Sequence, residues 1–136
     1  QLQLRAGWRF DMAKGYSGAY TKRYAEDSGA AVAFVEFFDG NTDAVMSYLS
    51  HTGPLVGALD FPLLFNAIRP SFSSADGMDF QPMGSLQAFS ILGRSSSQAF
   101  TFLQNHDLYG TPSPFDRVAP DWQVAQGHAI LLTHPG

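Results

Sequence analysis

Short apolar runs alternate along the chain with segments of helical periodicity. The apolar runs predict strands at residues 7–11, 30–38, 55–61 and 99–104. Spacing and capping signals predict helices at residues 17–28, 42–50, 62–69, 85–92 and 121–132, with Pro70 ending the third and Gly93 closing the fourth. Loops are expected at residues 71–84 and 110–120. Because no hairpin turn signal interrupts the alternation, it predicts an α/β fold with right-handed crossovers on a parallel sheet.

The first predicted strand brings two unlike charges to one place. Side chains alternate across a strand, so Arg9 and Asp11 share one face while Trp8 and Phe10 take the other. Burying these charges is costly unless they are paired or used. The pattern therefore predicts an Arg9–Asp11 pair. It leaves open whether the pair is functional or a structural ion pair at a strand end.

Polar residues follow the apolar strands at their carboxyl ends. They are Asp11, Glu36, Asp60 and the His106–Asp107 pair. In parallel α/β architectures, ligands bind and chemistry occurs at this edge of the sheet. The set therefore predicts a functional site, in which Asp60 is expected to be a hydrogen-bonding residue rather than a catalyst.

Composition narrows the class of protein. The chain has 136 residues, the size of one domain, and a net charge of −4, which argues against nucleic acid as a partner. There are no cysteines, so disulfides and thiolate metal sites are excluded. No apolar run approaches the roughly 18 residues that a membrane span requires.

Several motifs together resemble the alpha-amylase family of glycoside hydrolases. Residues 7–16 (GWRFDMAKGY) resemble the second characteristic region of that family, 34–40 (FVEFFDG) the third and 102–107 (FLQNHD) the fourth. Residues 59–63 resemble its sixth-strand segment, and 126–136 its helix before the last barrel strand. The motifs stand in the family's order. The resemblance implies part of a (β/α)8 TIM barrel, approximately strands four to seven with their helices.

The resemblance also implies a role for each site residue. Asp11 would be the nucleophile and Glu36 the general acid and base, while Asp107 would bind hydroxyl groups of the distorted sugar. Arg9 would keep Asp11 ionised. Further substrate contacts would come from Lys14, His106, Tyr16 and Phe37, and the Gly15 carbonyl would complete a structural calcium site. The implied enzyme is an alpha-amylase-like glycoside hydrolase that acts on alpha-1,4-glucans such as starch, glycogen and maltooligosaccharides.

The two main carboxyl groups also fit such chemistry by their surroundings. A retaining glycosidase needs one ionised and one protonated carboxyl group. Asp11 follows a cation by two residues, whereas Glu36 stands between Val35 and Phe37, where burial would raise its pKa. A transglycosylase of the same fold and a non-catalytic carbohydrate-binding relative are the alternatives.

The motif order predicts that residues 1–136 are a fragment of one catalytic barrel domain with both ends truncated. A partial barrel has open sheet edges, so the fragment alone is expected to be inactive and prone to aggregate. Its partners would be an alpha-glucan and the remainder of its own barrel. An extracellular location is favoured for the parent enzyme.

Overall fold

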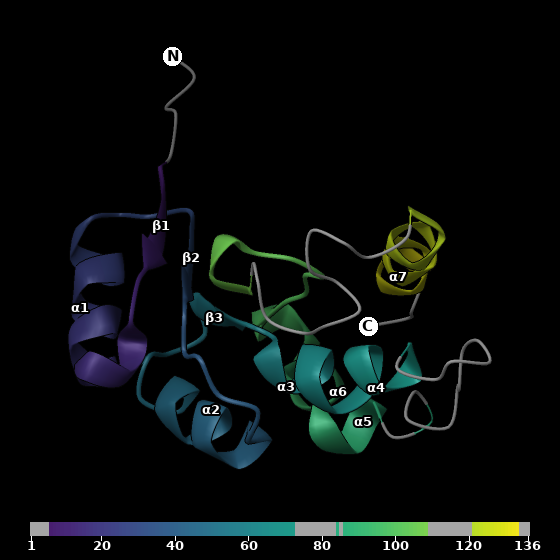
Figure 1. Cartoon of the computed structure of the whole chain (residues 1–136). Helices are drawn as coiled ribbons and strands as arrows, with labels where there is room; N and C mark the ends of the chain where they lie inside the picture. The colour runs from purple at the N-terminus through teal and green to yellow at the C-terminus, as the bar shows by residue number, and fades with distance from the viewer. Residues whose placement is uncertain (1–5, 73–83, 85, 109–120, 134–136) are drawn as a thin grey trace.

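The computed structural model is built on a four-stranded parallel sheet whose strands are adjacent in chain order (Figure 1). The strands are β1 (Gly7–Phe10), β2 (Val32–Val35), β3 (Val56–Leu59) and β4 (Ala99–Phe100). The structure describes residues 6–72, 84, 86–108 and 121–133, so the predicted loops at 71–84 and 110–120 lie almost wholly outside the described residues. The prediction of an α/β fold with a parallel sheet is confirmed, and the arrangement is compatible with part of a barrel.

Helical segments follow each of the four strands. Their bounds are α1 (Gly18–Asp27), α2 (Thr42–Leu49), α3 (Phe61–Leu63), the π-helical η2 (Leu64–Ile68), α4 (Arg69–Ser71), α5 (Leu86–Phe89), α6 (Ile91–Arg94) and α7 (Asp121–Thr133). Short 3-10 turns occupy η1 (Ala13–Gly15), η4 (Ser96–Gln98) and η5 (His106–Leu108). Capping explains where α1 and α2 begin, because the side chains of Ser17 and Asn41 accept hydrogen bonds from the first-turn amides. None of the described helices is long and apolar enough to span a membrane.

Two predicted helix ends are wrong. The helix after β3 continues through Pro70 to Ser71, because the wider π turn before it accommodates a ring that a regular α-helix would exclude. In that turn the Arg69 amide donates to the Leu64 carbonyl. The helix predicted at 85–92 is two short helices that meet at Ser90, whose hydroxyl accepts a hydrogen bond from Gly93. Gly93 therefore lies inside α6 and does not close a helix.

One face of the sheet is covered by helices. Alternate residues of the central strands, among them Val35 and Ala58, are buried against α1, α2 and α6. The apolar residues of this cluster are Ala13, Ala25, Ala33, Val35, Val45, Leu49, Val56, Ala58 and Ile91. Phe10 packs against the same cluster, so β1 presents it to the helical side of the sheet, as the alternation predicts.

The other face carries an aromatic pair across β3. Phe34 and Phe100 stack with ring centroids 4.8 Å apart, and Gly57 lies between their strands in the sheet. A Cβ on Gly57 would stand 2.6 Å from the Phe100 ring, so only glycine fits there. Val32, on the same face of β2, remains 46% exposed. The described residues therefore cover this face only in part, and it is the face from which the polar strand ends project.

Candidate active site

The pairing of β1 with β2 brings Asp11 and Glu36 together. Phe10 lies opposite Val35 in the parallel register, and each carboxylate residue comes directly after one of these partners. The Glu36 amide donates to the Phe10 carbonyl at 2.8 Å, and the Ala13 amide donates to the Glu36 carbonyl at 2.9 Å. Backbone hydrogen bonds therefore continue to hold the two chain segments together after Phe10 and Val35, the last paired residues of the strands.

Arg9 contacts both carboxylates through one nitrogen. Its Nη2 lies 2.9 Å from Asp11 Oδ1 and 3.0 Å from Glu36 Oε1. These two oxygens can therefore be at most 5.9 Å apart, the sum of the two distances. The predicted Arg9–Asp11 pair is confirmed, and the structure adds Glu36 as a second partner of the arginine.

The two carboxyl groups differ in exposure. The Asp11 side chain is 62% exposed, whereas Glu36 is only 6% exposed. Burial raises the pKa of Glu36, and the neighbouring Asp11 carboxylate adds to the rise, while the Met12 amide and Arg9 oppose it. The buried Glu36 Oε1 has the ionic contact from Arg9 and no further hydrogen bond among the described residues. Burial thus shifts Glu36 towards its protonated form relative to a free glutamate, as the sequence predicts.

The backbone of Met12 donates one of the hydrogen bonds that reach the Glu36 carboxyl group. Its backbone is left-handed, with φ 48° and ψ 46°, a conformation that costs an L residue free energy. The Met12 amide donates to Glu36 Oε2 at 3.3 Å, and its side chain is 74% exposed. The backbone strain thus coincides with a hydrogen bond to a candidate catalytic group.

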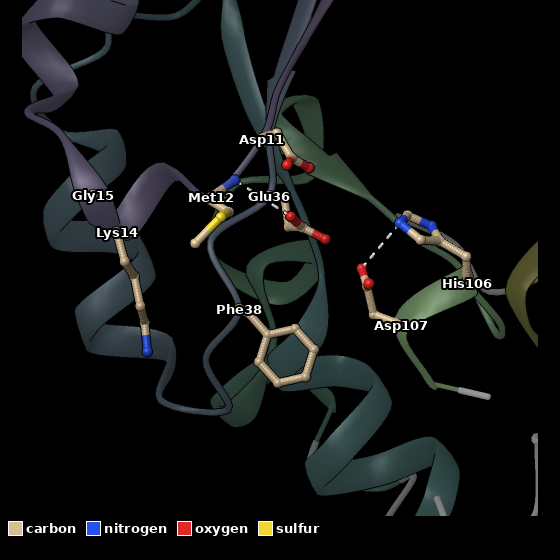
Figure 2. A pocket seen from close by; sticks show the side chains of 8 residues that line it. All are labelled: Asp11, Met12, Lys14, Gly15, Glu36, Phe38, His106 and Asp107. Carbon is tan, nitrogen blue, oxygen red and sulfur yellow. Dashed lines mark hydrogen bonds and ion pairs between the residues drawn. The ribbon is translucent and has the colours of Figure 1, made fainter. Parts of the chain in front are cut away.

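A cavity of about 330 Å³ lies in front of these carboxylates. Figure 2 shows the Asp11 and Glu36 side chains on one side of it and those of His106 and Asp107 facing them from η5. His106 Nε2 lies 3.4 Å from Asp107 Oδ2. The residues that line the cavity are Asp11, Met12, Lys14, Gly15, Glu36, Phe38, His106 and Asp107. The structure therefore brings together the three predicted catalytic carboxylates and the predicted histidine.

Phe37 is the predicted site residue that the structure directs elsewhere. It packs against the helix-covered core and has its ring centroid 5.1 Å from that of Tyr48 in α2. Phe38 lines the cavity instead. The sequence does contain a signal for this placement. If the alternation of β2 continues past its last residue, Phe34, Glu36 and Phe38 share one face, and Phe37 takes the other.

Arg9 and Tyr16 line a second, neighbouring groove of about 630 Å³ that also includes Asp11. The Tyr16 hydroxyl donates to the Asp11 carbonyl at 2.9 Å. Burial, with the charges of neighbouring groups, raises the pKa of Tyr16 to about 12. Tyr16 therefore stays a neutral hydrogen-bond donor that supports the Asp11 backbone.

Calcium binding through the Gly15 carbonyl stays a prediction. Calcium takes six to eight oxygen ligands, which can be carboxylates or backbone carbonyls. Among the described residues, no group of three or more His, Asp or Glu residues could hold a metal.

The fold and the site together define a carboxylate site at the C-terminal edge of a parallel α/β sheet. The chain is 30% identical to probable alpha-amylase 2 of Arabidopsis thaliana over 95% of its length, and 28% identical to the chloroplastic alpha-amylase 3 of the same plant over 96%. It spans 33% of the first relative and 16% of the second. No family model matches. The two relatives confirm the resemblance to the alpha-amylase family.

The comparisons do not support the expected extracellular location. Of the two relatives, the one whose name gives a compartment is chloroplastic.

Proposed function

We propose that this chain carries the catalytic centre of a retaining glycoside hydrolase that acts on alpha-1,4-glucans. The observation that carries the proposal is the shared contact of Arg9 with two carboxylates, whose contacting oxygens lie within 5.9 Å of each other. Retaining glycosidases hold their carboxyl groups about 5–5.5 Å apart, and inverting ones about 6.5–9.5 Å. The geometry therefore favours retention. The names of the two plant relatives support the substrate class.

In this proposal the two carboxyl groups perform a double displacement. The Asp11 carboxylate attacks the anomeric carbon, and the bond to the leaving sugar breaks as Glu36 gives its proton to the leaving oxygen. Glu36, now ionised, takes a proton from water, and the water oxygen attacks the anomeric carbon and releases Asp11. The burial of Glu36 and the exposure of Asp11 suit these roles, because one group must hold a proton that the other must lack.

The facing wall of the cavity would hold the sugar. Asp107 accepts hydrogen bonds from sugar hydroxyl groups in this proposal, and His106 adds a second polar contact beside it. Phe38 offers an apolar surface for the ring. Lys14 lines the same cavity, and the Tyr16 ring lines the neighbouring groove. An imidazole ring, a carboxylate and an aromatic surface form a set that suits a polyhydroxylated ligand.

The proposed enzyme needs more strands than the described sheet provides. A (β/α)8 barrel closes by pairing its edge strands, and β1 and β4 would be edges in a sheet of four. In the proposal, β1 to β4 correspond to strands four to seven of the barrel. Activity is therefore expected of the full-length product of the gene that encodes this chain, and the 136 residues alone are expected to be inactive.

Substitution of the two carboxylates tests the function. In the full-length product, Asp11→Asn is expected to abolish turnover of maltooligosaccharides while substrate still binds. Glu36→Gln is expected to lower kcat by about 10²–10⁴-fold, the usual contribution of general acid catalysis. Asp27→Asn, which alters an exposed pair with Arg23 within α1, is the matched control and should keep full activity.

The identity of the products separates the alternatives. Proton NMR of the first-formed sugar is expected to show the alpha anomer, since the mechanism retains configuration. A beta product would refute retention, and unchanged turnover in Asp11→Asn would refute the nucleophile. Products longer than the substrate in the presence of added acceptor sugar would indicate a transglycosylase. Binding of maltooligosaccharide without any turnover by the wild type would indicate a non-catalytic relative.

A further inference from the structure

An ion pair links the two segments that carry the catalytic carboxylates. Lys14 lies in η1, three residues after Asp11, and Asp39 lies three residues after Glu36. Lys14 Nζ contacts Asp39 Oδ2 at 2.7 Å. Figure 2 shows the Lys14 side chain running away from the two carboxylates. Its charge is thus paired across the two strand ends and is not directed at Asp11.

Both partners of this pair are held in place by further contacts. Asp39 Oδ1 accepts a hydrogen bond from the Asn41 amide at 2.9 Å, and Asn41 in turn caps α2. Lys14 Nζ lies 5.5 Å from the centre of the Phe37 ring, which itself packs on Tyr48. The bond from Lys14 and the Asn41 amide lower the pKa of Asp39. Asp39 is therefore held in its ionised form and anchored to α2.

Its position distinguishes it from ordinary surface pairs. Arg23–Asp27 and Lys22–Glu26 join residues within α1, and such pairs contribute little to a structure. Lys14–Asp39 instead joins segments that follow two neighbouring strands. Hydrogen bonds from the Met12 and Ala13 amides to Glu36 also connect these segments near the carboxylates, and both donors come before Lys14 in the chain. The ion pair adds a side-chain contact beyond them.

We propose that Asp39 is a positioning residue that acts through Lys14 to hold the Asp11 segment against the Glu36 segment. The role deepens the proposed glycosidase function and rests on it. The clamp fixes the separation of nucleophile and acid, and small displacements of catalytic groups can cost about 10²-fold in rate. Asp39 need not touch the substrate to have this effect.

A double-mutant cycle on two substrates tests the clamp. Asp39→Asn keeps an oxygen for the Asn41 amide but removes the charge, and Lys14→Met removes the partner. In the full-length product, Asp39→Asn should lower kcat on maltooligosaccharide by roughly 10- to 100-fold with a smaller change in KM. The Asp39 change should cost nothing further once Lys14 is methionine, because the two residues act as a unit.

The second substrate is alpha-maltosyl fluoride, whose leaving group departs without a proton. Asp39→Asn should lose clearly less turnover of it than of maltooligosaccharide, because only the attack of Asp11 then depends on the clamp and the placement of the acid matters little. If Asp39→Asn lost the same factor in turnover on both substrates, Asp39 would have a general structural role, and the clamp proposal would be refuted. So would a loss that persists when Asp39→Asn is added to Lys14→Met, since Asp39 would then act independently of the lysine.

Asp27→Asn is again the control, and circular dichroism of each variant shows that the fold is kept. If the wild type turns over neither substrate, the proposed function fails, and the clamp fails with it. If the wild type is active and the Asp39 variant matches it on maltooligosaccharide, the clamp alone fails.

Discussion

Replacing Asp60 with alanine is expected to destabilise the fold more than loss of any surface ion pair. Asp60 follows β3 and is fully buried. Its Oδ1 accepts hydrogen bonds from the amides of Leu63 at 2.9 Å and Ile91 at 3.1 Å, and its Oδ2 accepts one from Leu92 at 2.8 Å. One carboxylate therefore caps α3 and also ties α6 to the end of the sheet.

The magnitude follows from these three bonds. A hydrogen bond to a charged group contributes about 1.5–3 kcal/mol, and a buried donor left without a partner costs about 1–3 kcal/mol. Because the three bonds share one side chain, their losses do not simply add. We expect about 4 kcal/mol for Asp60→Ala, in the upper tail for single substitutions. Asp60→Asn keeps one acceptor oxygen and loses the bond from Leu92, so about 1–3 kcal/mol is expected.

Urea unfolding of the full-length product, followed by circular dichroism, measures the difference. The midpoints should fall in the order wild type, Asp60→Asn, Asp60→Ala. Asp43→Ala is the control, because it removes an aspartate that pairs with Arg94 between α2 and α6 at the exposed surface, where about 0–1 kcal/mol is expected. If Asp60→Ala unfolded at the same urea concentration as Asp43→Ala, the three amide bonds would not carry the stability assigned to them.

Four further predictions concern the cavity and the residues next to it. Asp11→Asn should lower the pKa of Glu36 in a carbon-13 NMR titration, because the Asp11 carboxylate helps to raise it; an unchanged pKa would contradict this. Since the folded-state pKa of Glu36 lies above its unfolded value, the wild type should lose stability as pH rises through that pKa. Glu36→Gln stays neutral and should lack this loss when urea unfolding is measured across pH; an equal loss in both proteins would contradict this. Met12→Gly should be tolerated in thermal unfolding, whereas Met12→Val should cost about 1–3 kcal/mol at the left-handed position. Phe37→Ala should cost roughly 3 kcal/mol of stability, whereas Phe38→Ala should mainly raise KM, and the opposite pattern would reverse their placement.

The convergence of Asp11 and Glu36 could be predicted because it depends on local pattern. Each residue stands near the carboxyl end of a predicted strand, and consecutive strands in crossover units become neighbours in a parallel sheet. The structure adds the register, with Phe10 opposite Val35. No knowledge of side-chain packing is needed to bring the two carboxylates to one edge.

The interrupted helix at Ser90 could not be predicted in this way. Its two pieces are separated because the Ile91 and Leu92 amides turn to Asp60, which lies 31 and 32 residues earlier in the chain. The continuation through Pro70 likewise depends on a π turn that nothing in the local composition indicates. Such contacts between distant segments override helix signals that are correct locally.

The two phenylalanines after Glu36 show that side chains continue to alternate between the two faces of the sheet beyond the end of β2. Val35 and Phe37 face the helices, whereas Glu36 and Phe38 face the cavity, so the period of two persists beyond the last residue of β2. The backbone after a strand is free to change direction, and alternation alone does not require this. The Lys14–Asp39 pair and the Phe37–Tyr48 contact supply the reason: they anchor the residues on either side of Phe38. The same contacts that keep Phe37 out of the cavity therefore keep Glu36 in it.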